Sequence, residues 1–254
     1  VIDVTERQLA EEELKNKTLE LQELNFQKDK LFSIIAHDLR SPFNSIIGFS
    51  DLLASKAREL PLDKVEDYAR LVRESAAGVH DLLDNLLAWA SIQMRGGQLN
   101  ARPLDLKRVV QASVGPLAHM AKDKKVLIEN GIGAVRPLGD EPLVRIVIRN
   151  LVSNGIKFSH GSGRVRLDAE TTSVEGRSMV RVSVADSGVG MEPETLQRLF
   201  DLHDTASKPG TGGEHGTGLG LYLCRDIVMR HGGEIHVSSE PGSGTNVQFT
   251  LPAA

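Results

Sequence analysis

Hydrophobic residues recur at helical spacing through the first 95 residues of the chain. One seam, spaced by seven, three, seven and four, consists of Leu14, Leu21, Leu24, Leu31 and Ile35. After a break at residues 58–63, a second stripe alternates three and four apart from Val65 to Trp89. The pattern predicts a coiled-coil helix that continues into an antiparallel helical hairpin. Two such hairpins would bury their apolar stripes in a homodimeric four-helix bundle.

The pattern changes after residue 95, where 22 of the 24 glycines lie. Apolar runs now alternate with turn residues, which predicts a helix layer on a mixed sheet. Helices are expected at 106–120, 141–158, 194–202 and 218–231. Strands are expected at 125–129, 164–171, 179–186, 234–239 and 246–251.

Composition excludes several classes of protein. The 254 residues include one cysteine, Cys224, so the chain is no disulfide-stapled scaffold and a reducing, cytoplasmic compartment is expected. A net charge of -4 argues against nucleic-acid binding. Since no apolar run approaches the roughly 18 residues of a membrane span, we expect a soluble fragment, whose full-length protein is free to be membrane-anchored. The histidines at 160, 203, 215, 231 and 236 have no metal-ligand spacing.

His37 is the candidate nucleophile. On a helical wheel it lies opposite the apolar side that contains Ile35, so its imidazole is expected to point outward. A neutral imidazole has one ring nitrogen free to attack, and the neighbouring carboxylate of Asp38 would accept the other ring proton. By itself, this pattern also fits an ordinary surface histidine.

Polar residues in the second half fit a nucleotide site. Asn150, Asn154 and Lys157 are spaced four and three apart, so they share one helix face and offer amide oxygens and a cation to MgATP. Asp186 ends an apolar strand and is followed by two glycines, which permit close approach to a flat ligand. Six glycines between residues 210 and 220 lead into a helix, as expected of a hinged phosphate-binding lid.

Five motifs resemble the boxes of bacterial sensor histidine kinases, in that family's order. HDLRSP at 37–42 resembles the H box, and DEPLVRIVIRNLVSNGIKFS at 140–159 the N box. DSGVG at 186–190, LFDLHD at 199–204 and HGTGLGLYLC at 215–224 resemble the G1, F and G2 boxes. The resemblance implies a HisKA-type helical hairpin in a dimeric four-helix bundle, followed by an α/β two-layer sandwich of the GHKL (Bergerat) type.

The resemblance also implies the activity and its residues. His37 would be phosphorylated from ATP and pass the phosphoryl group to an aspartate of a response regulator, with Asp38, Asn150 and Lys157 assisting. Asn154 resembles the magnesium ligand. Asn150 stands where related ATPases that hydrolyse ATP have a glutamate, and an amide cannot take a proton from water. The nucleotide-binding set implied by the resemblance is Asn150, Asn154, Lys157, Phe158, Asp186, Gly188, Gly190, Gly216, Thr217, Gly218, Leu219, Gly220 and Thr245.

These observations predict four segments and three partners. The segments are a signalling helix at 1–30, a dimerisation and phosphotransfer domain at 31–95, a hinge at 96–103 and an ATP-binding domain at 104–254. DVTER at 3–7 resembles the exit of a PAS-type domain, which implies an upstream sensor domain. The expected partners are a second copy of the chain, a response-regulator receiver domain and that sensor domain.

Two other functions stay open. One is a dimeric signalling scaffold that binds ATP without catalysis, although the five boxes argue against it. The other is a response-regulator phosphatase. In that family a Thr or Asn four residues after the histidine helps to position water, and Ser41 stands there in this chain, which makes the phosphatase function less favoured.

Overall fold

The computed structural model describes residues 2–94, 98–200, 209–214 and 218–254. Within the two long helices it does not describe the side chains of residues 2–7, 10, 16, 19–35, 37–38, 81, 85, 88–89 and 91–94. The chain divides into two compact units, Val1–Leu82 and Leu83–Ala254.

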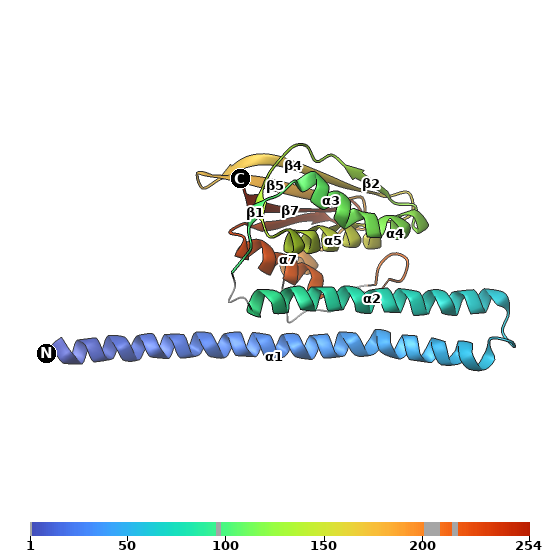
Figure 1. Cartoon of the computed structure of the whole chain (residues 1–254), viewed down its shortest axis with the longest axis horizontal. Coiled ribbons are helices and arrows are strands. Elements are labelled where there is room, and N and C mark those ends of the chain that lie inside the picture. The colour runs from blue at the N-terminus through green and yellow to red at the C-terminus, as the bar shows by residue number, and fades with distance from the viewer. Residues whose placement is uncertain (1, 95–97, 201–208, 215–217) are drawn as a thin grey trace. The chain divides into compact units, whose positions relative to one another are not determined.

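The first unit is helical, as the hydrophobic pattern predicts. Helix α1 (Ile2–Lys56) and helix α2 (Leu62–Met94) run antiparallel, joined by the turn at 57–61 (Figure 1). Their packing includes stacked rings of Phe49 and Tyr68, with centroids 5.4 Å apart. In the α2 stripe, Val79 and Leu82 are buried. Among the described residues, no helix combines the length and apolarity that a membrane crossing requires.

The second unit is built on a five-stranded mixed sheet in the order β2-β4-β5-β7-β6. β2 pairs with β4 in parallel and the other neighbours are antiparallel. The strands are β2 (Leu127–Asn130), β4 (Arg164–Val174), β5 (Arg177–Asp186), β6 (Ile235–Glu240) and β7 (Gly244–Pro252). The predicted α/β two-layer architecture is confirmed.

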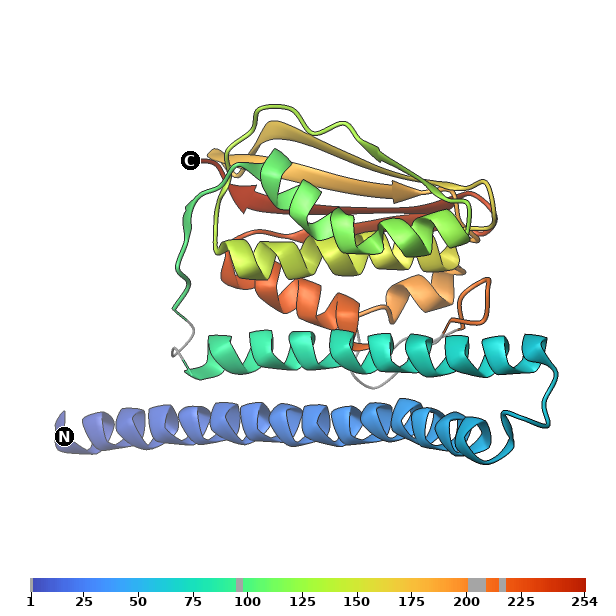
Figure 2. The ribbon, with the colours of Figure 1, turned by 45° about the vertical axis from the view of Figure 1, so that its right-hand side comes forward.

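Helices cover one face of this sheet (Figure 2). α5 packs on β4 and β5, α7 packs on β6 and β7, and α3 packs on α5. The helices are α3 (Leu106–Val114), α4 (Ala118–Asp123), α5 (Glu141–Phe158), α6 (Pro193–Gln197) and α7 (Leu219–Arg230), with the short 3-10 helix η1 (Gly115–Leu117) between α3 and α4.

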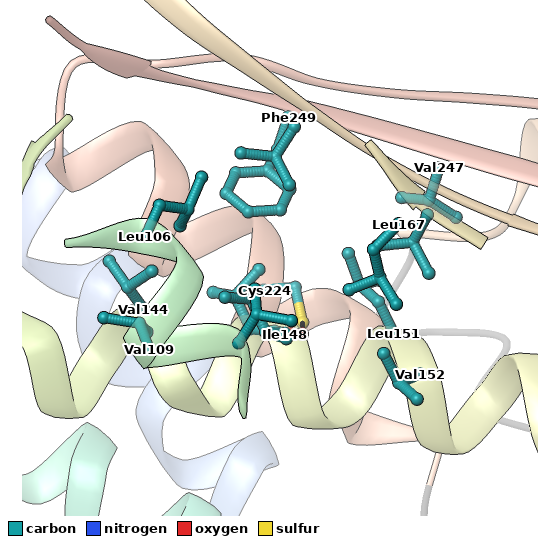
Figure 3. Close-up of a cluster of buried hydrophobic side chains, with 14 of the residues drawn as sticks. Leu106, Val109, Val144, Ile148, Leu151, Val152, Leu167, Cys224, Val247 and Phe249 are labelled. Carbon is teal, nitrogen blue, oxygen red and sulfur yellow. Dashed lines mark hydrogen bonds between the residues drawn. The ribbon is translucent and has the colours of Figure 1, made fainter. Parts of the chain in front are cut away.

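The core lies between the helices and the sheet. Figure 3 shows side chains of α5, such as Ile148 and Val152, facing Leu167 of β4 and Phe249 of β7. Cys224 of α7 is fully buried in this cluster, and burial raises the pKa of its thiol. Cys224 is therefore an unreactive core residue.

The structure differs from the predicted elements at three places. The helix expected at 194–202 ends at Gln197, residues 198–200 form a turn, and residues 201–202 lie outside the described part of the chain. The single helix expected at 106–120 is divided by η1, because Pro116 has no N–H to continue the α-helical ladder. A two-stranded sheet, β1 (Arg102–Pro103) with β3 (Leu138–Gly139), has no predicted counterpart. Since β1 lies in the segment expected as a hinge, the end of that segment is fixed to the second unit.

Candidate functional site

The polar face of α5 forms one wall of the site. The helix starts with Pro142 in its first turn, where a missing N–H costs nothing, and buries its apolar residues in the core. Asn150 and Asn154 are half-buried, whereas Lys157 is only 8% exposed. The Asn150 amide donates to the carbonyl of Ile146 over 3.0 Å. The three residues that the spacing places on one face therefore follow one another along the helix.

Lys157 is held in an unusual environment for an ammonium group. Burial lowers its pKa and nearby Lys124 lowers it further, while the carboxylate of Glu214 raises it; the net result is a pKa below the ordinary value. Its Nζ lies 4.8 Å from the ring centroid of Phe158, within reach of a cation–π interaction. A buried cation of this kind gains from an anionic ligand.

Asp186 stands at the end of β5, beside the end of α5. Its Oδ1 accepts the N–H of Gly188 at 2.8 Å and that of Thr245 at 3.2 Å. Burial raises the pKa of this carboxyl to about 6, although the two N–H groups oppose the rise. Among the described residues, no hydrogen bond to Oδ2 is observed, so this oxygen is left to accept from a ligand.

Glycines allow the close approaches around Asp186. A Cβ on Gly188 would stand 2.6 Å from the carbonyl oxygen of Phe158, and one on Gly155 would stand 2.9 Å from Val165. Gly190 has a φ of 68° and abuts the backbone of Glu240. Gly155 is a site residue that sequence analysis did not identify, since nothing in the N-box spacing distinguishes it.

The start of α7 meets the middle of α5. Gly218 caps α7 in the left-handed conformation with a φ of 68°, and Leu219 is buried. A Cβ on Gly220 would stand 2.6 Å from Oδ1 of Asn150. The glycine-rich helix start and the polar face of α5 are thus in direct contact, as expected of two walls of one nucleotide site.

The described part of the glycine-rich segment is attached to the end of α5. Thr211 donates from its hydroxyl to the carbonyl of Ser159 at 2.6 Å and from its N–H to the carbonyl of Lys157 at 3.1 Å. Lys124 pairs with Glu214 over 2.6 Å. Neither Lys124 nor Glu214 is indicated by the sequence pattern, because the two lie 90 residues apart and belong to none of the five motifs.

Some of the predicted site residues lie outside the part of the chain that the structure describes. The side chains of His37 and Asp38, on α1, and the residues Gly216 and Thr217 are not among the described positions. In the described residues, no group of three or more His, Cys, Asp or Glu side chains has metal-binding geometry. The amide oxygen of Asn154 is nonetheless a suitable ligand type for Mg2+, which binds through few protein oxygens plus phosphate and water.

Two known protein families match this chain, one in each half. Residues 27–95 match the His Kinase A (phospho-acceptor) domain. Residues 139–254 match the histidine kinase-, DNA gyrase B- and HSP90-like ATPase family.

Curated relatives match along nearly the whole chain. An uncharacterised sensor-like histidine kinase of Rhizobium meliloti is 29% identical over 99% of this chain, and the histidine protein kinase DivJ of Caulobacter vibrioides is 31% identical over 98%. The chain spans 48% and 41% of the length of these two relatives.

Solved structures share the fold. Full-length ShkA in complex with AMPPNP matches with a TM-score of 0.57 at 25% identity, over 87% of this chain and 45% of ShkA. The histidine kinase AdeS of Acinetobacter baumannii matches with a TM-score of 0.59 at 20% identity, over 85% of this chain and 98% of AdeS.

Proposed function

Since the chain belongs to the sensor histidine kinases of two-component systems, we propose that it transfers the γ-phosphoryl group of ATP to His37 and from there to an aspartate of a response regulator. The observation that carries the proposal is the pairing, in one chain, of a phosphoacceptor-type hairpin with a fold that presents Asp186 as a half-buried acceptor.

The adenine would be recognised by Asp186. Its Oδ2 would accept the exocyclic amino group, while Oδ1 is occupied by Gly188 and Thr245. Guanine has an oxygen acceptor at the corresponding position, so the same carboxylate selects against it. The expected nucleotide-binding set is completed by Gly190, the residues at 216–218, Leu219 and Gly220.

The phosphates would be held at the polar face of α5. Lys157 supplies a buried positive charge, Phe158 packs against that cation, and Asn150 and Asn154 supply amide groups. Asn154 would ligate Mg2+, which neutralises phosphate charge when it is bound. Because Asn150 is an amide, it takes no proton from water, and this favours transfer to His37 over hydrolysis.

At His37, a neutral ring nitrogen would attack the γ-phosphorus as the bond to the bridging oxygen breaks and ADP departs with the electron pair. Asp38 would stabilise the positive charge that develops on the ring by accepting a hydrogen bond from the other nitrogen. The phosphohistidine formed would then donate its phosphoryl group to the receiver aspartate.

A homodimer follows from the helical hairpin. Phe43 and Ile47 of α1 expose 45% and 57% of their surface in the single chain, and Leu62 at the start of α2 exposes 73%. Burying such apolar residues against a second hairpin is favourable, as in other four-helix bundles. An upstream sensor domain, attached before DVTER at 3–7, would act through this bundle.

Labelling with γ-labelled ATP tests the proposal. The wild type is expected to retain acid-labile label, and His37→Gln is expected to abolish the label while fluorescent-nucleotide binding is retained. Binding without label in the wild type would identify the scaffold instead. Addition of an isolated receiver domain to the labelled chain measures phosphotransfer, as label that appears on the receiver. The later loss of label from the receiver measures the phosphatase activity, which Ser41 makes less favoured.

A further inference from the structure

Lys124 lies at the turn between α4 and β2, outside all five sequence motifs, yet it contacts the nucleotide site at two points. Its Nζ donates to the carbonyl oxygen of Lys157 and forms an ion pair of 2.6 Å with Oε1 of Glu214. The Lys124 and Glu214 side chains are 14% and 31% exposed, so water screens this pair less than a surface pair.

Glu214 in turn organises the described start of the glycine-rich segment. Its Oε2 accepts the N–H of Gly212 at 2.8 Å, and its carbonyl accepts the N–H of Gly210 at 2.8 Å. A side chain on Gly210 would collide with both Glu214 and Lys157. Residues 210–214 therefore form a closed turn whose carboxylate faces Lys124.

The same cation stabilises the end of α5. The last carbonyls of a helix have no partner within it and carry partial negative charge, which a nearby ammonium offsets. The Lys157 carbonyl accepts from Lys124 Nζ and from the N–H of Thr211. Burial would raise the pKa of Glu214, but the hydrogen bonds from Lys124 and from backbone N–H groups bring it below its ordinary value.

We infer that Lys124 is a positioning residue for ATP binding: through Glu214 and the Lys157 carbonyl, it fixes the glycine-rich turn 210–214 and the phosphate-side end of α5 in one arrangement. The ligand set itself rests on the proposed function. Lys124 acts through Glu214 and Lys157 and touches no reacting atom. Its loss should therefore weaken binding of ground state and transition state alike, which raises KM with little change in kcat.

The test compares Lys124→Met with Lys122→Met, which makes the same change at an exposed lysine of α4 two residues away. Lys124→Met and Glu214→Gln are each expected to weaken ATP-analogue binding and raise KM for ATP about five- to tenfold, with kcat within about twofold of the wild type. Lys122→Met is expected to match the wild type. Lys124→Arg should restore part of the affinity.

The pairing itself is tested with a double variant. Lys124→Met with Glu214→Gln should lose no more than the worse single variant, since one interaction is removed twice. The inference fails if Lys124→Met binds ATP as Lys122→Met does, or if the two losses multiply. Unfolding curves of each variant identify loss of folding. If Lys124→Met does not fold, the decision passes to Glu214→Gln, which must weaken ATP binding while Lys124→Arg retains more of it.

The proposed function fails by a different result. If the wild-type chain binds nucleotide but takes up no label, the proposed kinase activity is refuted. The role of Lys124 in nucleotide binding can still be measured in that case, from the binding affinities of the variants.

Discussion

The backbone N–H of Asp140 donates a hydrogen bond of 3.0 Å to Nε2 of His231, and both residues are buried. Nδ1 of His231 lies 2.7 Å from the carbonyl of Ile227, so this nitrogen must hold the proton. The Asp140 carboxylate accepts the N–H of Asn100 at 3.1 Å. His231 thus joins the end of α7 to the start of α5 as a neutral imidazole of one tautomer.

Acid should weaken the connection that His231 makes between α7 and α5. Burial lowers the pKa of His231, although the Ile227 carbonyl and the Asp140 charge oppose the shift. His231 therefore binds a proton more readily in the unfolded chain than in the folded chain. Its contribution to the free energy of unfolding falls as pH drops through the ordinary histidine pKa of about 6.5. Thermal unfolding of the wild type and of His231→Gln between pH 7.5 and 5.5 measures this as a difference, because protonation of Asp186, whose pKa is about 6, stabilises both proteins over the same range.

Two variants distinguish the role of His231 as a hydrogen-bond acceptor from its role as a titratable group. His231→Leu leaves the Asp140 N–H unpaired and should cost about 1–3 kcal/mol at pH 7.5, a cost that shrinks toward pH 5.5 as the wild-type imidazole takes up a proton. His231→Gln keeps an amide oxygen near Nε2 and should lose part of the acid sensitivity of the wild type. An unchanged pH profile in His231→Gln would assign the sensitivity to other groups.

Asp186→Asn should stabilise the empty protein and abolish its function. The raised pKa of about 6 means that ionised Asp186 destabilises the fold at pH 8. The asparagine oxygen still accepts from Gly188 and Thr245, so the unfolding temperature should rise by at least about 2 °C, the shift that 1 kcal/mol produces in a chain of this size.

The gain should shrink below pH 6, where the wild-type carboxyl is itself protonated. ATP binding by Asp186→Asn should fall more than about tenfold, as expected when a charged hydrogen-bond acceptor is replaced. Asp123→Asn, at an exposed carboxylate of α4 that pairs with the exposed His119, is the control for loss of a surface charge. A lower unfolding temperature in Asp186→Asn at pH 8 would contradict the account.

Gly220→Ala should reduce kinase activity without unfolding the chain. The added Cβ would meet Oδ1 of Asn150 at 2.6 Å, and this side chain is the part that can move. Displacing Asn150 should lower the autophosphorylation rate about tenfold or more, since phosphoryl transfer depends on alignment.

Gly133→Ala is the matched control for that variant. Gly133 lies in the exposed loop after β2, has no positive φ and has nothing within 4 Å of an added Cβ. The change should alter stability by less than about 1 kcal/mol and leave the rate unchanged. Equal activity in Gly220→Ala and Gly133→Ala would show that the contact with Asn150 has no catalytic consequence.

The regular elements follow from the sequence because each has a long apolar period. α5 begins and ends where the pattern predicts, at Glu141 and Phe158. The pair β1 and β3 could not be predicted in this way, because two-residue strands contain no period. The divided helix at Pro116 was within reach, since proline interrupts an α-helix.

For the candidate site residues, too, a prediction was possible only where a local sequence pattern exists. Asn150, Asp186 and Gly220 lie in motifs whose local spacing indicates their chemistry. Lys124 and His231 make contacts across 90 and 91 residues of chain, with Glu214 and Asp140. Such pairs leave no local pattern, so a structure is needed to identify them.

The pairing of β1 with β3 fixes the segment before α3 to the beginning of α5. Asn100 and Arg102 are bound to Asp140 and Gly139, just before the first residue of α5. Lys157 lies near the opposite end of this helix, about 24 Å along its axis from Glu141. The strand pair and the proposed phosphate-binding residues therefore occupy the two opposite ends of one helix, so a displacement of β1 acts on the end of α5 that is remote from Lys157.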